Sequence, residues 1–140
     1  MTADELKLFE LYLSTAEKIS DRRAQANAWL LSIASALTAL QNLMKPDSGL
    51  SAGRALALTW TIPSAGIVVA IAWMALLLSY RQLNSAKFKV LQEMESDFTH
   101  RPFARERDIY KAERRISFSD VEALVPVAFF FFFAIELFVR

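Results

Sequence analysis

The chain contains no cysteine and a single histidine, His100, among its 140 residues. Disulfides, thiolate nucleophiles and thiolate metal ligands are therefore excluded, and one imidazole is too few for a histidine-based metal centre. The three glycines, Gly49, Gly53 and Gly66, lack the spacing of a phosphate-binding loop. Because the sequence offers no nucleophile, base and orienting group that would converge in a pocket, we expect neither enzymatic activity nor a cofactor.

Charged residues are absent from two long stretches, residues 24–44 and 55–80. Crossing the hydrocarbon core of a bilayer takes about 20 predominantly apolar residues in a helix, so both stretches are long enough. A third stretch, residues 121–139, includes five consecutive phenylalanines and is just long enough to cross, with a hairpin in one leaflet as the alternative. With 54% apolar residues and a mean hydropathy of +0.27, the chain is predicted to be an all-α integral membrane protein with three transmembrane helices.

Amphipathic segments extend the first two predicted spans. Apolar residues recur at three- and four-residue steps over residues 3–23 and 83–98, and charged residues occupy the other positions. No glycine or proline precedes Pro46, so one helix is expected from about residue 3 to residue 44. Two extensions on the same side of the membrane can bury their apolar stripes against each other. We therefore predict a cytoplasmic helical hairpin between residues 1–23 and the first part of segment 81–120.

Breaker residues divide this single membrane domain. Pro46 and Gly49 predict an outer loop at residues 45–54, and Pro63 predicts a kink or a helix start near Thr61. A short surface helix is expected at residues 103–115, after Pro102. The sequence Ser-Asp-Val-Glu at residues 119–122 fits a capping box, in which serine and glutamate satisfy helix-end amides, and it predicts the start of the third span.

Lysine and arginine decide the orientation. With the N-terminus inside, thirteen of the sixteen lie in the N-terminal segment and in residues 81–115, whereas Lys45, Arg54 and Arg140 lie outside. Positive residues of short loops stay in the cytoplasm, so we expect a multi-pass protein with a cytoplasmic N-terminus. The net charge of +1 gives no indication of a nucleic-acid partner, and the partners expected from the residues are lipid and protein.

Two sets of polar residues inside the spans are candidate functional groups. Glu136 lies within the last span, where it either pairs with Arg140 one turn on or faces a central axis as part of an acidic ring. The first span carries a stripe of small and polar residues, which indicates close helix packing or a pore lining. The polar members of this stripe are Ser32, Ser35, Thr38 and Asn42.

Several stretches resemble the RipA-like octameric membrane proteins of bacteria. They are residues 19–23 (Ile-Ser-Asp-Arg-Arg) with Asn27, residues 80–84 (Tyr-Arg-Gln-Leu-Asn) with the Val-Leu-Gln-Glu-Met-Glu of 90–95, and Glu122 with Pro126. One departure is that the proline expected soon after Glu95 is delayed to Pro102. The resemblance implies a ring of eight subunits in the inner membrane. A more distant similarity is to the SLATT class of small membrane effectors.

The leading hypothesis is a homo-oligomeric ring in the bacterial inner membrane, acting as an ion-conducting pore or a membrane effector. The alternative is a membrane-anchored adaptor that binds a cytoplasmic protein through the basic segment 101–115. Charged and amide residues beside the spans are expected to contact neighbouring subunits or lipid headgroups. They are Arg22, Arg23, Asn84, Lys87, Glu93 and Glu95.

Overall fold

The computed structural model describes residues 3–43, 52–97, 100–112 and 118–139. These ranges contain four α-helices, α1 (Ala3–Leu43), α2 (Ala52–Met94), α3 (Pro102–Ala112) and α4 (Phe118–Phe138), together with a 3-10 turn, η1 (Glu95–Asp97). The prediction of an all-α chain is confirmed. The predicted surface helix at 103–115 corresponds to α3, and its last three positions lie outside the described residues.

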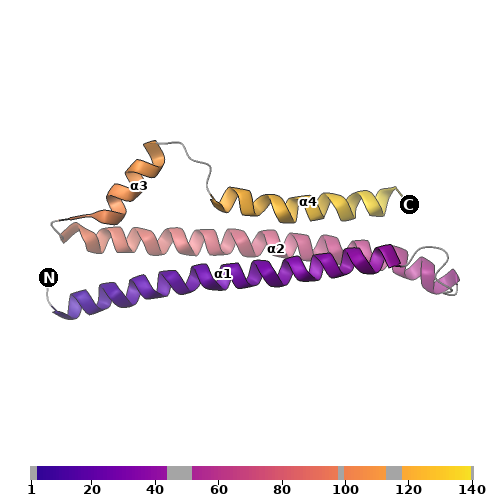
Figure 1. Ribbon diagram of the computed structural model, residues 1–140, viewed down its shortest axis with the longest axis horizontal. Helices are drawn as coiled ribbons and strands as arrows, with labels where there is room; N and C mark the ends of the chain where they lie inside the picture. The colour runs from indigo at the N-terminus through magenta and orange to yellow at the C-terminus, as the bar shows by residue number, and fades with distance from the viewer. Residues whose placement is uncertain (1–2, 44–51, 98–99, 113–117, 140) are drawn as a thin grey trace.

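α1 and α2 form a long antiparallel hairpin (Figure 1). The buried face of α1 includes Ala16, Ile19 and Ala34, which recur at intervals that keep one side of a helix toward its partner. Ala34 packs in a cluster with Trp73 and Leu77 of α2. Apolar burial thus runs along the pair from Ala16 to Ala34 of α1.

The predicted amphipathic extensions contact each other at the far end of this hairpin. Lys87 Nζ of α2 donates a hydrogen bond of 2.9 Å to Thr15 Oγ1 of α1, and the ammonium lies 4.7 Å from the centre of the Tyr12 ring. Leu91, one turn further along α2, is fully buried.

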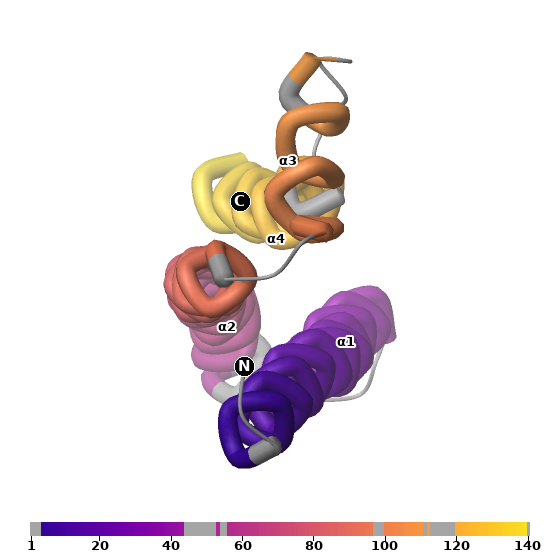
Figure 2. Tube along the Cα trace, turned by 90° about the vertical axis from the view of Figure 1, so that its left-hand side faces the viewer, coloured from indigo at the N-terminus to yellow at the C-terminus, as the bar shows by residue number. Residues whose placement is uncertain are grey.

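α4 lies along the apolar half of α2. α2 therefore contacts both α1 and α4 (Figures 1 and 2). Gly66 permits this packing, because a Cβ atom at that position would lie 2.5 Å from the ring of Phe133. Ala70, one turn on, is also buried. Small residues of α2 thus let the phenylalanine-rich helix approach closely within one chain.

Two helices in the described part of the chain are long and apolar enough to cross a membrane, not the three that were predicted. They are the apolar part of α2, within Leu56–Met94, and α4, within Asp120–Phe138. The second half of α1 falls short because four amide side chains interrupt its uncharged stretch, and these are Gln25, Asn27, Gln41 and Asn42. Absence of charge at residues 24–44 was therefore a weaker signal than the hydropathy of the whole segment.

Pro63 neither starts nor stops a helix. α2 begins at Ala52, so the expected start near Thr61 is wrong, and the last residues of the predicted loop 45–54 belong to the helix. Pro63 is fully buried inside α2. Beside it, Thr61 Oγ1 donates to the Ala57 carbonyl at 2.8 Å and Ser64 Oγ donates to the Trp60 carbonyl at 2.7 Å. Hydroxyl groups that bond the backbone in this way are one means by which apolar helices tolerate proline.

Candidate functional site

A layer of ion pairs joins α4 to the two hairpin helices near the start of α4. Arg23 Nε of α1 lies 3.5 Å from Glu122 Oε2, and both side chains are largely buried. Arg81 Nη1 of α2 donates to Asp120 Oδ1 at 2.8 Å, and both of these side chains are half exposed. Arg23, predicted to contact lipid or a neighbouring subunit, therefore has a carboxylate partner in its own chain, whereas Arg22 is exposed.

The capping box predicted at residues 119–122 does not match the helix, because α4 begins one residue before Ser119; Glu122 pairs with Arg23 instead. α4 begins at Phe118, and the side chain of Ser119 lies outside the described part of the chain. At 3.5 Å the contact of Glu122 with Arg23 is electrostatic rather than a hydrogen bond. Burial of both partners strengthens their attraction, because little water screens them.

One turn further along α1, a hydrogen bond holds α1 to α2. Trp73 Nε1 donates to Asn27 Oδ1 at 2.8 Å. The Trp73 ring also lies 6.2 Å, centre to centre, from the ring of Phe129 in α4. Trp73 thus touches both neighbours from the centre of the bundle. This contact could not be predicted from the sequence, because a tryptophan in a continuous apolar run carries no signal of a polar partner.

Glu136 is engaged with α1 at the opposite end of α4. Its Oε2 accepts a hydrogen bond of 2.8 Å from Gln41 Nε2, and Gln41 is buried. The predicted partner Arg140 lies outside the described residues. α1 and α4 are therefore joined by polar contacts at two levels, Arg23–Glu122 and Gln41–Glu136.

The predicted small and polar stripe of α1 lies on its outward face. Ser32, Ser35 and Asn42 are exposed and Thr38 is half-buried. Ser32 Oγ donates to the Ala28 carbonyl at 2.8 Å, Thr38 Oγ1 to the Ala34 carbonyl at 2.9 Å, and Asn42 Nδ2 to the Thr38 carbonyl at 3.1 Å. Three of the four polar groups thus use acceptors within their own helix, so they need no water to satisfy these donors.

The two glutamates near the end of α2 have different surroundings. Glu93 is exposed, whereas Glu95 is fully buried and accepts two backbone hydrogen bonds, from Phe103 N at 2.7 Å and Ala104 N at 3.1 Å. These are the second and third residues of α3, whose amides lack partners inside the helix. Glu95, predicted to contact lipid or another subunit, therefore caps α3. Pro102 occupies the first position of that helix, which needs no amide hydrogen.

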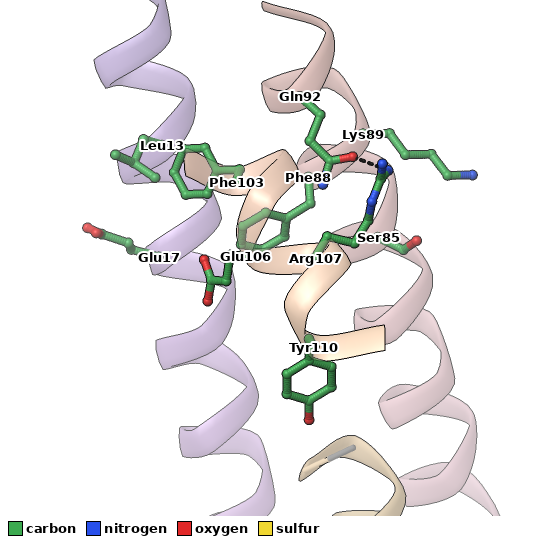
Figure 3. A pocket seen from close by; sticks show the side chains of 10 residues that line it. All are labelled: Leu13, Glu17, Ser85, Phe88, Lys89, Gln92, Phe103, Glu106, Arg107 and Tyr110. Carbon is green, nitrogen blue, oxygen red and sulfur yellow. Dashed lines mark hydrogen bonds between the residues drawn. The ribbon is translucent and has the colours of Figure 1, made fainter. Parts of the chain in front are cut away.

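A groove of about 670 Å³ lies where α3 crosses the hairpin. Figure 3 shows the rings of Phe88 and Phe103 side by side, with Arg107 beside Gln92. The two rings meet edge to face at 6.0 Å, and Arg107 Nη1 donates to Gln92 Oε1. Asn84, another predicted contact residue, is half-buried and directly precedes Ser85, which lines this groove.

The polar contacts described above join the helices to one another. In the parts of the chain that the structure describes, no three acidic, histidine or cysteine side chains lie close enough to hold a metal ion. Gln41, Trp73 and Glu95 form hydrogen bonds across helix interfaces. The oxygens Gln41 Oε1, Asn84 Oδ1 and Glu122 Oε2 are buried without a hydrogen bond to any described residue.

Comparison with known proteins identifies one family. The model of the octameric membrane protein family matches residues 6–140, which is nearly the whole chain. This match confirms the resemblance carried by residues 19–23 and 80–95. No curated protein and no solved structure matches.

Proposed function

From the premise that this chain belongs to the octameric membrane protein family, we propose that it assembles into a ring of eight copies in the bacterial inner membrane. α2 and α4 cross the bilayer in this arrangement, and the second half of α1 crosses beside them as a third span. Function then resides in the assembly, and we propose no enzymatic activity for the chain.

The main support for this proposal is the outward face of α1. Residues 24–43 are less apolar than the other two helices, and Ser32, Ser35 and Asn42 are exposed on one copy. A polar face toward hydrocarbon is less favourable than the same face packed on protein, where small residues allow close contact. Neighbouring copies would cover this face, and α1 would then span the membrane without the hydropathy of a lipid-exposed helix.

Positive charges support a cytoplasmic position for the paired extensions. The N-terminal half of α1, the end of α2 and α3 all belong to the segments that carry thirteen of the sixteen lysines and arginines. The hairpin ends and α3 would therefore form a cytoplasmic layer below the ring.

Ion conduction is a second candidate, favoured by the partly buried carboxylate of Glu136 inside a membrane helix. Reconstitution in planar bilayers tests it, with Glu136→Gln as the variant. We expect a current that falls or changes selectivity when the carboxylate is removed. Absence of current, or a current indifferent to the substitution, removes the pore but leaves the ring.

The mass of the intact particle tests self-assembly directly. Eight chains of 15.8 kDa give a particle of about 126 kDa, which native mass spectrometry of the detergent-solubilised protein resolves from smaller oligomers. A homogeneous particle with one kind of polypeptide supports the ring. A monomer bound to a stoichiometric second protein supports the adaptor alternative instead, with the groove beneath α3 as its binding surface.

A further inference from the structure

A second groove lies between α2 and α4, and it is almost entirely apolar. Its volume is about 410 Å³. Ile71, Ala75 and Leu78 of α2 line it, together with Val127 and Phe131 of α4. All five side chains are exposed on the single chain.

This groove faces away from α1. On α2, Trp73 bonds α1, and Ala75 is turned from it by about 200° around the helix, at about 100° per residue. On α4, Glu136 bonds Gln41 of α1. Phe131 precedes Glu136 by five residues, so the two side chains are separated by about 140° around the helix. The groove and α1 therefore lie on opposite sides of the α2–α4 pair.

The outward face of α1 is the second uncovered surface inside the apolar region. Small residues line it at three- and four-residue steps, and all of them are exposed. They are Ala28, Ser32, Ser35, Ala36 and Ala39. This surface, called here the small face of α1, points away from the rest of its own chain.

The groove and the small face lie at the same level along the bundle. Asn27 of α1 bonds Trp73 of α2, and Leu30 packs against the cluster that contains Trp73 and Leu77. Residues 27–32 of α1 therefore share a level with residues 71–78 of α2. Ala28 and Ser32 on the small face are thus level with Ile71 and Ala75 in the groove.

Ring symmetry requires two such surfaces. A ring of more than two identical subunits joins one face of each copy to a different face of the next, and symmetry about the membrane normal keeps every residue at its level. In a ring of eight, neighbours differ by a rotation of about 45°, so the two faces must lie on nearly opposite sides of each subunit. The small face of α1 and the α2–α4 groove meet both conditions.

We infer that the subunits meet head to tail, with the small face of α1 of one copy seated in the α2–α4 groove of the next. This interface rests on the proposed self-assembly and specifies its geometry. Small side chains let the α1 backbone approach the groove, and the bulky rings of α4 fill the space beside it. The hydroxyl of Ser32 enters without an unsatisfied donor, because it bonds the Ala28 carbonyl.

Cysteine cross-linking tests this interface on the full-length protein in its native membrane. The chain has no cysteine, so introduced pairs act without background. Ala28→Cys with Ala75→Cys places one thiol on each surface at the same level. Under mild oxidation we expect a ladder of disulfide-linked oligomers on a non-reducing gel. Each single variant is expected to remain monomeric on that gel.

Ala28→Cys with Ala72→Cys is the matched control. Ala72 is an exposed alanine three residues from Ala75, and the helix turns it out of the groove by about 60°. We expect its cross-linking to be at least several-fold weaker.

The outcomes separate the interface from the assembly. An intact particle of eight copies that cross-links no better through Ala75→Cys than through Ala72→Cys overturns the interface and leaves self-assembly standing. A strong cross-link from Ala28→Cys alone would join two α1 helices, and it also overturns the interface. A lipid acyl chain recovered from the groove overturns it as well. A particle that contains one copy overturns both proposals.

Discussion

Glu93 and Glu95 show how differently two neighbouring carboxylates can be used. Both were predicted to contact lipid or other subunits. Glu93 is exposed on the single chain, so its contact stays a prediction, whereas Glu95 is buried against the first amides of α3. A carboxylate at a helix N-terminus supplies acceptors for unpaired amides and also opposes the positive end of the helix dipole. Glu95 thus fixes where α3 begins, although the two residues look equivalent in the sequence.

We predict that Glu95→Gln loosens α3. Glutamine keeps one oxygen acceptor, so one of the two bonds to Phe103 N and Ala104 N is lost together with the charge. The expected cost is about 1–2 kcal/mol, or about a 5- to 30-fold faster amide hydrogen exchange across α3. Mass spectrometry of the exchanged peptides measures it. Glu93→Gln is the control, and an equal effect of the two variants would show that Glu95 does not cap the helix.

At Gly66, a single added carbon atom would disturb the packing of α4 on α2. We expect Gly66→Ala to lower the free energy of unfolding by about 1–3 kcal/mol, because the added Cβ would overlap the Phe133 ring. Thermal unfolding in detergent measures the change.

Two further variants test the cause of this loss. Gly53→Ala, where nothing lies within 4 Å of the added atom, should not destabilise the protein. Phe133→Leu in the Gly66→Ala background should recover part of the loss. A Gly66→Ala protein as stable as the original would mean that α4 does not approach α2 at this point.

At the scale of elements, most helix ends could be predicted from breaker residues and periodicity. α1 and α3 lie close to the predicted ranges, because Pro46 and Pro102 interrupt clear patterns, and α4 begins at Phe118, one residue before the predicted capping box. The start of α2 was missed because Pro63 was interpreted from its local effect alone. The hydropathy of α1 was overestimated because its amide side chains are uncharged.

The contacts between elements were beyond a single sequence. Asn27–Trp73 joins residues 46 positions apart and Gln41–Glu136 joins residues 95 positions apart. Their pairing depends on how far one helix is shifted along another, and no local pattern records that shift. The sequence did identify Glu136 as unusual, since a carboxylate among apolar residues requires a partner.

The two ion pairs at the start of α4 should differ in how much they contribute to the free energy of unfolding. We predict that Glu122→Gln costs about 1–3 kcal/mol of stability, because it leaves Arg23 largely buried without its carboxylate. Asp120→Asn should cost less than about 1 kcal/mol, since the Arg81–Asp120 pair is half exposed and screened by water. Unfolding midpoints of the two variants in the same detergent make the comparison, and equal losses would contradict it.

At the scale of the whole molecule, orientation in the membrane can be measured with single cysteines. We expect Lys7→Cys in α1 and Glu106→Cys in α3 to react with a membrane-impermeant maleimide only in inverted vesicles, because the positive-inside rule places both in the cytoplasm. Asp47→Cys, between α1 and α2, should react in intact cells with a permeable outer membrane. Labelling of Glu106→Cys from outside would reverse the proposed topology.

α2 is one unbroken helix of 43 residues, about 65 Å from end to end. In the proposed topology, this helix would connect the interior of the bilayer with the groove beneath α3. Met94 lies about 30 Å beyond Met74, so a tilt of about 10° at Met74 displaces the tip of the helix by about 5 Å. In the proposed topology, a small tilt of α2 within the bilayer would therefore move its cytoplasmic end by about the size of a side chain.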